Sequence, residues 1–142
     1  MNASFSMDTF PIYSPEKELQ VLAKLAKEGK HVDWKPAIIL AATYVEKYGI
    51  ERLQKFFEGK EVDLSGKFET FSLSDVSILL YGLNLIDSKT YTHMNQIWCE
   101  RRSIIHQKGR IPKGDYLGDE ANTKYTPMLR NATQIIRTLS DK

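Results

Sequence analysis

Hydrophobic residues recur at helical spacing along most of this chain, in segments that glycines and polar stretches separate. The spacing predicts a first helix over residues 15–29, with Ser14 as its N-terminal cap and Pro15 in its first turn. It predicts a second helical region over residues 33–59, where Gly49 interrupts a broad apolar face. This region is therefore expected to form either one kinked helix or two helices.

Two further helices are expected in the middle of the chain. Ser72 is followed three residues later by Asp75, which is the pattern of a capping box, and apolar residues continue at helical spacing to about Ile86. The pair Asp87–Ser88 then caps a helix over residues 89–107. This last helix carries the most informative residues of the chain.

The connecting segments are rich in turn-forming residues. Residues 59–71 are predicted to form a polar loop, in which the alternation of residues 68–71 gives a weak signal for a strand. Residues 108–122 are predicted to form a long loop because they contain Gly109, Pro112, Gly114 and Gly118. A loop of that length often has a function. Pro127 is then expected to open the last helix.

These segments predict an all-α fold, an up-and-down bundle of five to six helices. The length of 142 residues fits one domain. We expect this domain to span residues 15–142, with residues 1–14 as an N-terminal tail or packing arm. The apolar runs are too short to cross a membrane, and the first residues lack the pattern of a signal peptide. The sequence therefore predicts a cytoplasmic protein with no membrane partner.

Composition argues against several kinds of site. Cys99 is the only cysteine, so it can form no internal disulfide and no cysteine-based metal site. His31 and His93 lack the neighbouring ligands that a zinc site needs. We therefore expect no metal and no cofactor. The formal net charge of +2 does not by itself indicate a nucleic-acid partner, so such a partner has to be argued from local clustering.

The helix over residues 89–107 places a charged residue among apolar ones. At about 100° per residue, Arg101 falls near the centre of an apolar stripe. The stripe consists of Met94, Ile97, Trp98, Ile104 and Ile105. An unpaired guanidinium is costly to bury, so Arg101 needs a carboxylate, an anion or an interface there. His106 lies five residues later, about 140° round the helix, near a helix end where the dipole favours a protonated imidazole.

Two interpretations of this helix are open. In the first, Arg101 pairs with a core carboxylate and His106 is an ordinary exposed residue. In the second, Arg101 is a bidentate clamp for a phosphate and His106 carries a proton near neutral pH. The flanking segment favours the second, because five basic residues between Glu100 and Lys113 suit a nucleic-acid backbone. These basic residues are Arg101, Arg102, Lys108, Arg110 and Lys113.

The segment Trp98–His106, with the sequence WCERRSIIH, resembles the Arg-x4-His motif of HEPN domains (higher eukaryotes and prokaryotes nucleotide-binding). Residues 83–87 are similar to the segment that precedes the motif in many of these proteins. The resemblance covers residues 72–107 and is compatible with the helices on either side.

The resemblance implies a helical bundle that dimerises through the motif-bearing helices, here residues 89–107. Many HEPN domains are metal-independent endoribonucleases whose arginines and histidines form a composite site in the dimer cleft. By this resemblance, His106 would act on the 2′-hydroxyl or on the leaving oxygen, and Arg101 would stabilise charge developing on the phosphate. The weaker candidates for contacts with the RNA are Arg102, Ser103, Lys108 and Arg110.

We therefore predict a homodimer that is either a metal-independent endoribonuclease or an RNA-binding protein. Some HEPN proteins act in toxin–antitoxin or defence systems, so a nucleotidyltransferase-type or other protein is a further candidate partner. Lys108 stands where toxins of that kind often carry a tyrosine, so modification by such a partner is not expected from the motif. The alternative is a non-catalytic HEPN module for dimerisation or partner binding. A helical DNA-binding regulator ranks last, because no short helix pair with a basic recognition helix is visible.

Overall fold

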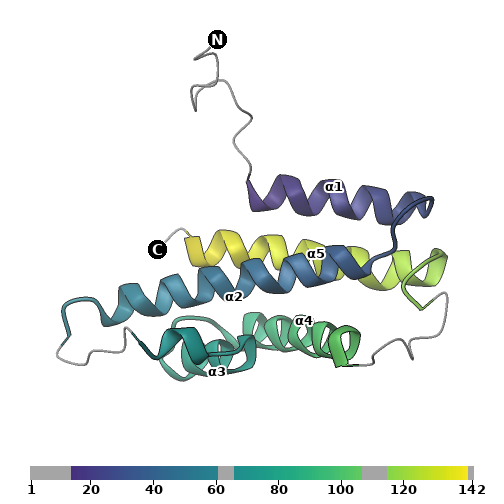
Figure 1. The fold of residues 1–142 in the computed structure, drawn as a ribbon. Coiled ribbons are helices and arrows are strands. Elements are labelled where there is room, and N and C mark those ends of the chain that lie inside the picture. The colour runs from purple at the N-terminus through teal and green to yellow at the C-terminus, as the bar shows by residue number, and fades with distance from the viewer. Residues whose placement is uncertain (1–13, 61–65, 107–114, 141–142) are drawn as a thin grey trace, which may run out of the picture.

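The computed structural model describes residues 14–60, 66–106 and 115–140, which form five α-helices and one short 3-10 helix and contain no strand. The elements are α1 (Pro15–Glu28), α2 (Lys35–Phe57), η2 (Phe68–Thr70), α3 (Leu73–Gly82), α4 (Ser88–His106) and α5 (Asp119–Ser140). Figure 1 shows the long helices packed side by side, with α1 antiparallel to α2 and α4 antiparallel to α5. The predicted all-α helical bundle is confirmed.

Helix α1 begins and ends where its sequence predicts. Ser14 Oγ accepts a hydrogen bond from Lys17 N at 3.1 Å. Gly29 closes the helix with φ at 68°, a left-handed conformation that glycine adopts without strain. Residues 1–13, predicted to be a tail or arm, lie outside the described residues.

The second helical region forms one continuous helix, α2, which Gly49 does not interrupt. Gly49 is buried where α3 packs on α2, and a Cβ atom there would lie 2.4 Å from Val76 Cγ1. The glycine therefore permits a close approach of two helices. Helix α2 contacts each of the four other α-helices, so it lies at the centre of the bundle.

Helix α3 begins as predicted but is shorter than expected. Ser72 Oγ accepts from Asp75 N at 3.2 Å, and Ser72 N donates to Asp75 Oδ2 at 2.9 Å, which completes the predicted capping box. The helix ends at Gly82 and not near Ile86. The reason is that Asn84 adopts a left-handed φ of 59°, which a continuing right-handed helix does not allow.

The connecting segments differ from their predictions. The strand signal in residues 68–71 is wrong, because these residues form η2 and the extended residue after it. The Phe68 and Phe71 rings pack edge to face with centres 5.5 Å apart, so the two aromatic residues serve local packing and not a sheet. In the predicted long loop, residues 115–118 form the turns before α5, and residues 107–114 lie outside the described residues.

Helix α5 begins at Asp119, so the prediction that Pro127 opens it is wrong. Pro127 lies inside the helix, where it removes one backbone donor. Tertiary contacts stabilise the turns before the proline. Asn122 Oδ1 accepts a hydrogen bond from Nε1 of the fully buried Trp34 at 2.9 Å, and Tyr125 is only 2% exposed. These tertiary contacts stabilise helical turns on the N-terminal side of Pro127, which the position of the proline alone does not predict.

One hydrophobic core joins the five helices. Its largest fully buried side chains include Trp34, Ile38, Leu53, Leu80, Met94, Ile97 and Tyr125. None of the helices within the described ranges combines the length and the apolar character that crossing a bilayer requires.

Candidate functional site at the end of α4

Helix α4 carries most residues of the candidate site. Asp87 caps it as predicted, since Asp87 Oδ1 accepts a hydrogen bond from Thr90 N at 2.8 Å. This bond lowers the pKa of Asp87. Met94 and Ile97 are buried and hold the helix against the core. Because these two buried residues fix which face of α4 lies against the core, they also fix the directions in which the side chains of its last turns point.

Arg101 points toward α2 and pairs with a carboxylate there. Its Nη1 donates to Glu46 Oε2 at 3.0 Å, and the two side chains are 20% and 25% exposed. Glu46 is thus the carboxylate that an arginine on an apolar stripe requires. Because a guanidinium has five N–H donors, one bond to Glu46 leaves others available to a second acceptor.

His106 is the last residue of α4 and is exposed. Because His106 follows Arg101 by five residues, the two side chains leave the helix axis in directions about 140° apart. The structure thus places the two predicted catalytic residues at the same helix end, but their side chains leave it on different sides. Among the described residues, no contact joins them.

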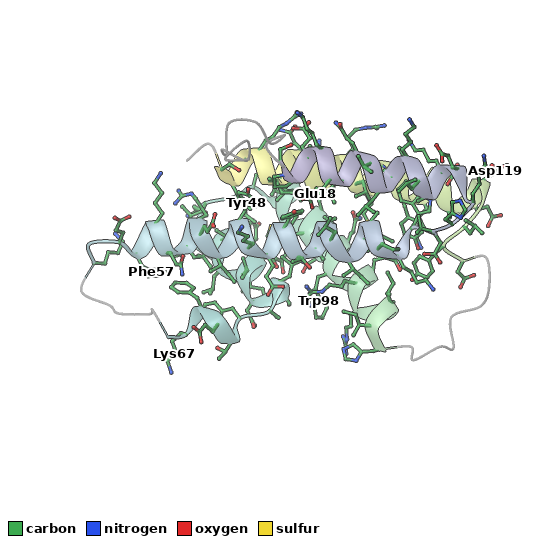
Figure 2. The ribbon with its side chains drawn as sticks, turned by 45° about the horizontal axis from the view of Figure 1, so that its top comes forward. Glu18, Tyr48, Phe57, Lys67, Trp98 and Asp119 are labelled. Carbon is green, nitrogen blue, oxygen red and sulfur yellow. The ribbon has the colours of Figure 1, made fainter. Side chains whose placement is uncertain are left out.

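The other predicted substrate contacts have different environments. Arg102 is exposed, and its guanidinium carbon lies 5.3 Å from the centre of the Trp98 ring, within range of a cation–π interaction. Figure 2 shows Trp98 on the side of the bundle that faces away from α1. Ser103 lines a groove between α4 and α5. Lys108 and Arg110 lie outside the described residues.

Glu100 is a site residue that the sequence analysis did not single out. Tyr116 OH donates to Glu100 Oε2 at 2.8 Å, and Lys124 Nζ lies 3.3 Å from Glu100 Oε1. The Glu100 side chain is 13% exposed. The Tyr116 ring stacks on Tyr125 with ring centres 5.4 Å apart. A mostly buried carboxylate is therefore held in place from α5 and from the turn before it.

Burial raises the pKa of both Tyr116 and Tyr125, and the neighbouring Glu100 carboxylate raises each further. Both hydroxyls therefore stay protonated at neutral pH. No pattern in the sequence indicates this cluster, because Lys124 and Tyr125 can be placed on a helix only if α5 is known to begin before Pro127.

A groove of about 710 Å³ lies between α4 and α5 beside this cluster. Its lining consists of Thr92, Asn95, Gln96, Cys99, Glu100 and Ser103 from α4 and Lys124, Pro127, Met128 and Asn131 from α5. A second hollow of about 370 Å³ shares Glu100, Ser103 and Lys124 with it. Throughout the part of the chain that the structure describes, no group of three or more His, Cys, Asp or Glu residues is placed to hold a metal ion.

No family model matches this sequence, and comparisons with curated proteins and with solved structures give no match either. Membership of the HEPN family is therefore a proposal that rests on the motif in α4 and on its setting in a helical bundle.

Proposed function

We propose that this protein is a HEPN-like helical domain that acts on RNA as a homodimer and cleaves it without a metal ion. The observation that supports this proposal is the difference in environment between two side chains at the end of α4. Glu46 fixes the guanidinium of Arg101 at 3.0 Å, whereas His106 is exposed. The first side chain supplies a positioned, permanent positive charge, and the second can exchange protons with a ligand.

In the proposed reaction, the 2′-oxygen of a ribose attacks the adjacent phosphorus, and the bond from phosphorus to the 5′-oxygen breaks. The imidazole of His106 takes the proton from the 2′-hydroxyl or gives one to the leaving 5′-oxygen, and water accepts or supplies the other proton. Arg101 stabilises the negative charge that develops on the other phosphate oxygens. Glu46 contributes by positioning Arg101, so it is a positioning residue.

A second copy of the chain is part of this proposal. Because Arg101 and His106 diverge by about 140° on one helix, a phosphate that touches both is best placed where two α4 ends meet. Ile105, between them in sequence, is 53% exposed. An exposed isoleucine at the end of α4 suits a contact between copies.

The test is cleavage of mixed cellular RNA in the presence of a chelator. We expect the wild type to cleave and His106→Ala to be inactive, with an unchanged thermal unfolding midpoint because His106 is exposed. His93→Ala is the matched control, since His93 also lies on α4 but far from its C-terminal end, and it should cleave like the wild type. Cleavage by His106→Ala would contradict the mechanism.

The second candidate is a non-catalytic module for dimerisation or partner binding. The Arg101–Glu46 pair favours it, because this pair satisfies the guanidinium within one chain and needs no bound phosphate. Neither the wild type nor His106→Ala would then cleave RNA, while sedimentation would still show a dimer. Ile105→Glu should separate the copies. A wild type that is monomeric and inactive would contradict the homodimeric ribonuclease and the dimerisation module, and it would leave partner binding as the function of this surface.

A further inference from the structure

Three side chains lie in one row along the last turns of α4. Trp98, Arg102 and His106 follow one another at intervals of four residues. Each interval is about 40° round the helix and about 6 Å along its axis, so the three side chains leave α4 on the same side. Arg101 is not part of this row, because it points about 100° away from Arg102 and pairs with Glu46 on α2. The arginine on the His106 side of α4 is therefore Arg102.

The Arg102 guanidinium is held in place but has no anionic partner. Its central carbon lies 5.3 Å from the centre of the Trp98 ring, within range of a cation–π interaction. Contact with the ring reduces the number of positions that this long side chain adopts. Within the ranges that the structure describes, Arg102 makes no ion pair and no side-chain hydrogen bond. Its N–H donors are therefore available to an acceptor with two oxygens, which a planar guanidinium binds best.

Arg102 and His106 can reach the same ligand group. Side chains four residues apart on a helix are neighbours, with about 5–6 Å between their Cβ atoms. Both residues are exposed, so neither has to move out of the core to meet a ligand. A permanent cation thus lies one helical turn from an imidazole that can exchange a proton.

The charges at this end of α4 favour an anion. Glu100 is the only acidic residue in the sequence of the helix. It leaves α4 about 160° away from Arg102, on the side where Tyr116 and Lys124 interact with it. The seven residues that follow His106 in the sequence include three basic residues and no acidic one. An anion beside Arg102 and His106 therefore meets attraction and little repulsion.

From these features we propose that Arg102 binds the phosphate on which His106 of the same protomer acts, and that Trp98 positions the Arg102 guanidinium for this contact. The inference rests on the proposed action on RNA, and it gives the two neighbouring arginines different roles. Arg102 holds the phosphate from the protomer that supplies His106, whereas Arg101 approaches it from the second copy. Trp98 touches no substrate and is a positioning residue.

The test is binding of a short 2′-O-methyl uridine RNA, measured by fluorescence anisotropy at several salt concentrations. The methyl groups prevent cleavage through the 2′-oxygen. Arg102→Gln keeps a planar polar end but loses the charge, and we expect it to bind about tenfold more weakly at low salt. The slope of log affinity against log salt should become shallower by about 0.7, the value for one phosphate contact in a single strand. Arg130→Gln removes the same charge from an exposed position on α5 and should change neither quantity.

A double variant tests whether Arg102 and His106 share one phosphate. If they do, either substitution alone already weakens the hold on that phosphate. Arg102→Gln combined with His106→Ala should then lose less affinity than the sum of the two single losses in binding free energy. Additive losses would place the two side chains on different phosphates and would overturn the shared site.

The positioning role of Trp98 has its own test. Trp98→Leu should weaken RNA binding severalfold, but should cause no further loss in a protein that already carries Arg102→Gln. Trp98→Phe keeps a ring under the guanidinium and should restore most of the affinity. Because Trp98 also packs against the core, the thermal unfolding midpoint of each variant is measured alongside. Equal losses from Trp98→Leu with and without Arg102 would show that Trp98 has a structural role only.

The outcomes separate this inference from the proposed function. A wild type that binds no RNA would contradict the action on RNA and the role of Arg102 together. A wild type that binds RNA, with the same affinity and the same salt slope in Arg102→Gln, would overturn the role of Arg102 alone.

Discussion

Arg101 and Glu46 form an ion pair between α4 and α2, with Arg101 Nη1 at 3.0 Å from Glu46 Oε2 and with side chains that are 20% and 25% exposed. The partners are 55 positions apart in the sequence, so the bond exists only once the bundle has formed. Because water reaches both groups only in part, removal of one leaves the other incompletely compensated. The pair therefore contributes to stability whether or not Arg101 also contacts RNA.

We expect Arg101→Ala to lower the free energy of unfolding by about 1–3 kcal/mol, and Glu46→Ala to do so by a similar amount. Urea denaturation measures both, and the double variant should lose less than the sum of the two because the pair is lost only once. Arg137→Ala is the control, since Arg137 pairs with Glu16 in a more exposed setting, and its cost should be about 0–1 kcal/mol. Additive losses at Arg101 and Glu46 would show that the pair does not couple them.

Gly49→Ala tests the contact between α2 and α3. The new methyl group would lie 2.4 Å from Val76 Cγ1, so the helices must move apart, at a cost of about 1–3 kcal/mol. Alanine gains at most about 1 kcal/mol over glycine in helix propensity. We therefore expect a net loss of stability. Gly82→Ala, with nothing within 4 Å of its added Cβ, should be neutral or stabilising. A stabilising Gly49→Ala would contradict the close packing.

The helix boundaries that the sequence predicted correctly depend on local contacts. Ser14, Ser72 and Asp87 each accept a hydrogen bond from a backbone N–H three residues later. The capping residue and its bonding partner therefore lie in the same short stretch of sequence. The prediction at Pro127 failed, and the sequence left open whether one helix or two surround Gly49, for the opposite reason. What decides their conformation is packing against other helices, which a local pattern does not contain.

At the candidate site, too, local sequence patterns do not identify contacts between helices. The apolar stripe on α4 correctly required a partner for Arg101, but identifying Glu46 needs the register between α4 and α2. Glu100 carried no signal at all, because its partners Tyr116 and Lys124 follow residues 107–114 in the chain and become neighbours only in the folded bundle.

The bond from Tyr44 to Glu18 predicts a pH dependence of stability at high pH. Tyr44 OH donates to Glu18 Oε2 at 2.5 Å, and this bond, with some burial, raises the pKa of Tyr44 to about 12 from 10.0. In the unfolded chain Tyr44 loses its proton above pH 10, whereas the folded chain keeps it until about pH 12. The stabilisation is therefore complete below pH 10 and falls between pH 10 and 12.

Tyr44→Phe isolates this effect from the other groups that titrate in the same range. At neutral pH the wild type should be more stable than Tyr44→Phe by about 1 kcal/mol, the contribution of one hydrogen bond. The difference should shrink when urea unfolding is repeated above pH 10. A difference that stays constant up to pH 12 would mean that the bond to Glu18 does not hold the Tyr44 proton.

Asn122→Ala tests what holds the first turns of α5 in place before Pro127. The variant leaves Trp34 Nε1 without its acceptor in a residue that is fully buried, so we expect a loss of about 1–3 kcal/mol in the free energy of unfolding. Thr123→Ala, at the exposed neighbouring position, should change stability by less than about 0.5 kcal/mol.

Hydrogen exchange then shows which part of α5 the loss of the Asn122 side chain affects. In Asn122→Ala the amides between Asp119 and Pro127 should exchange faster, while those after Pro127 keep their protection. Faster exchange along all of α5 would instead indicate that Asn122 supports the whole helix and that the turns before the proline are not a separate unit.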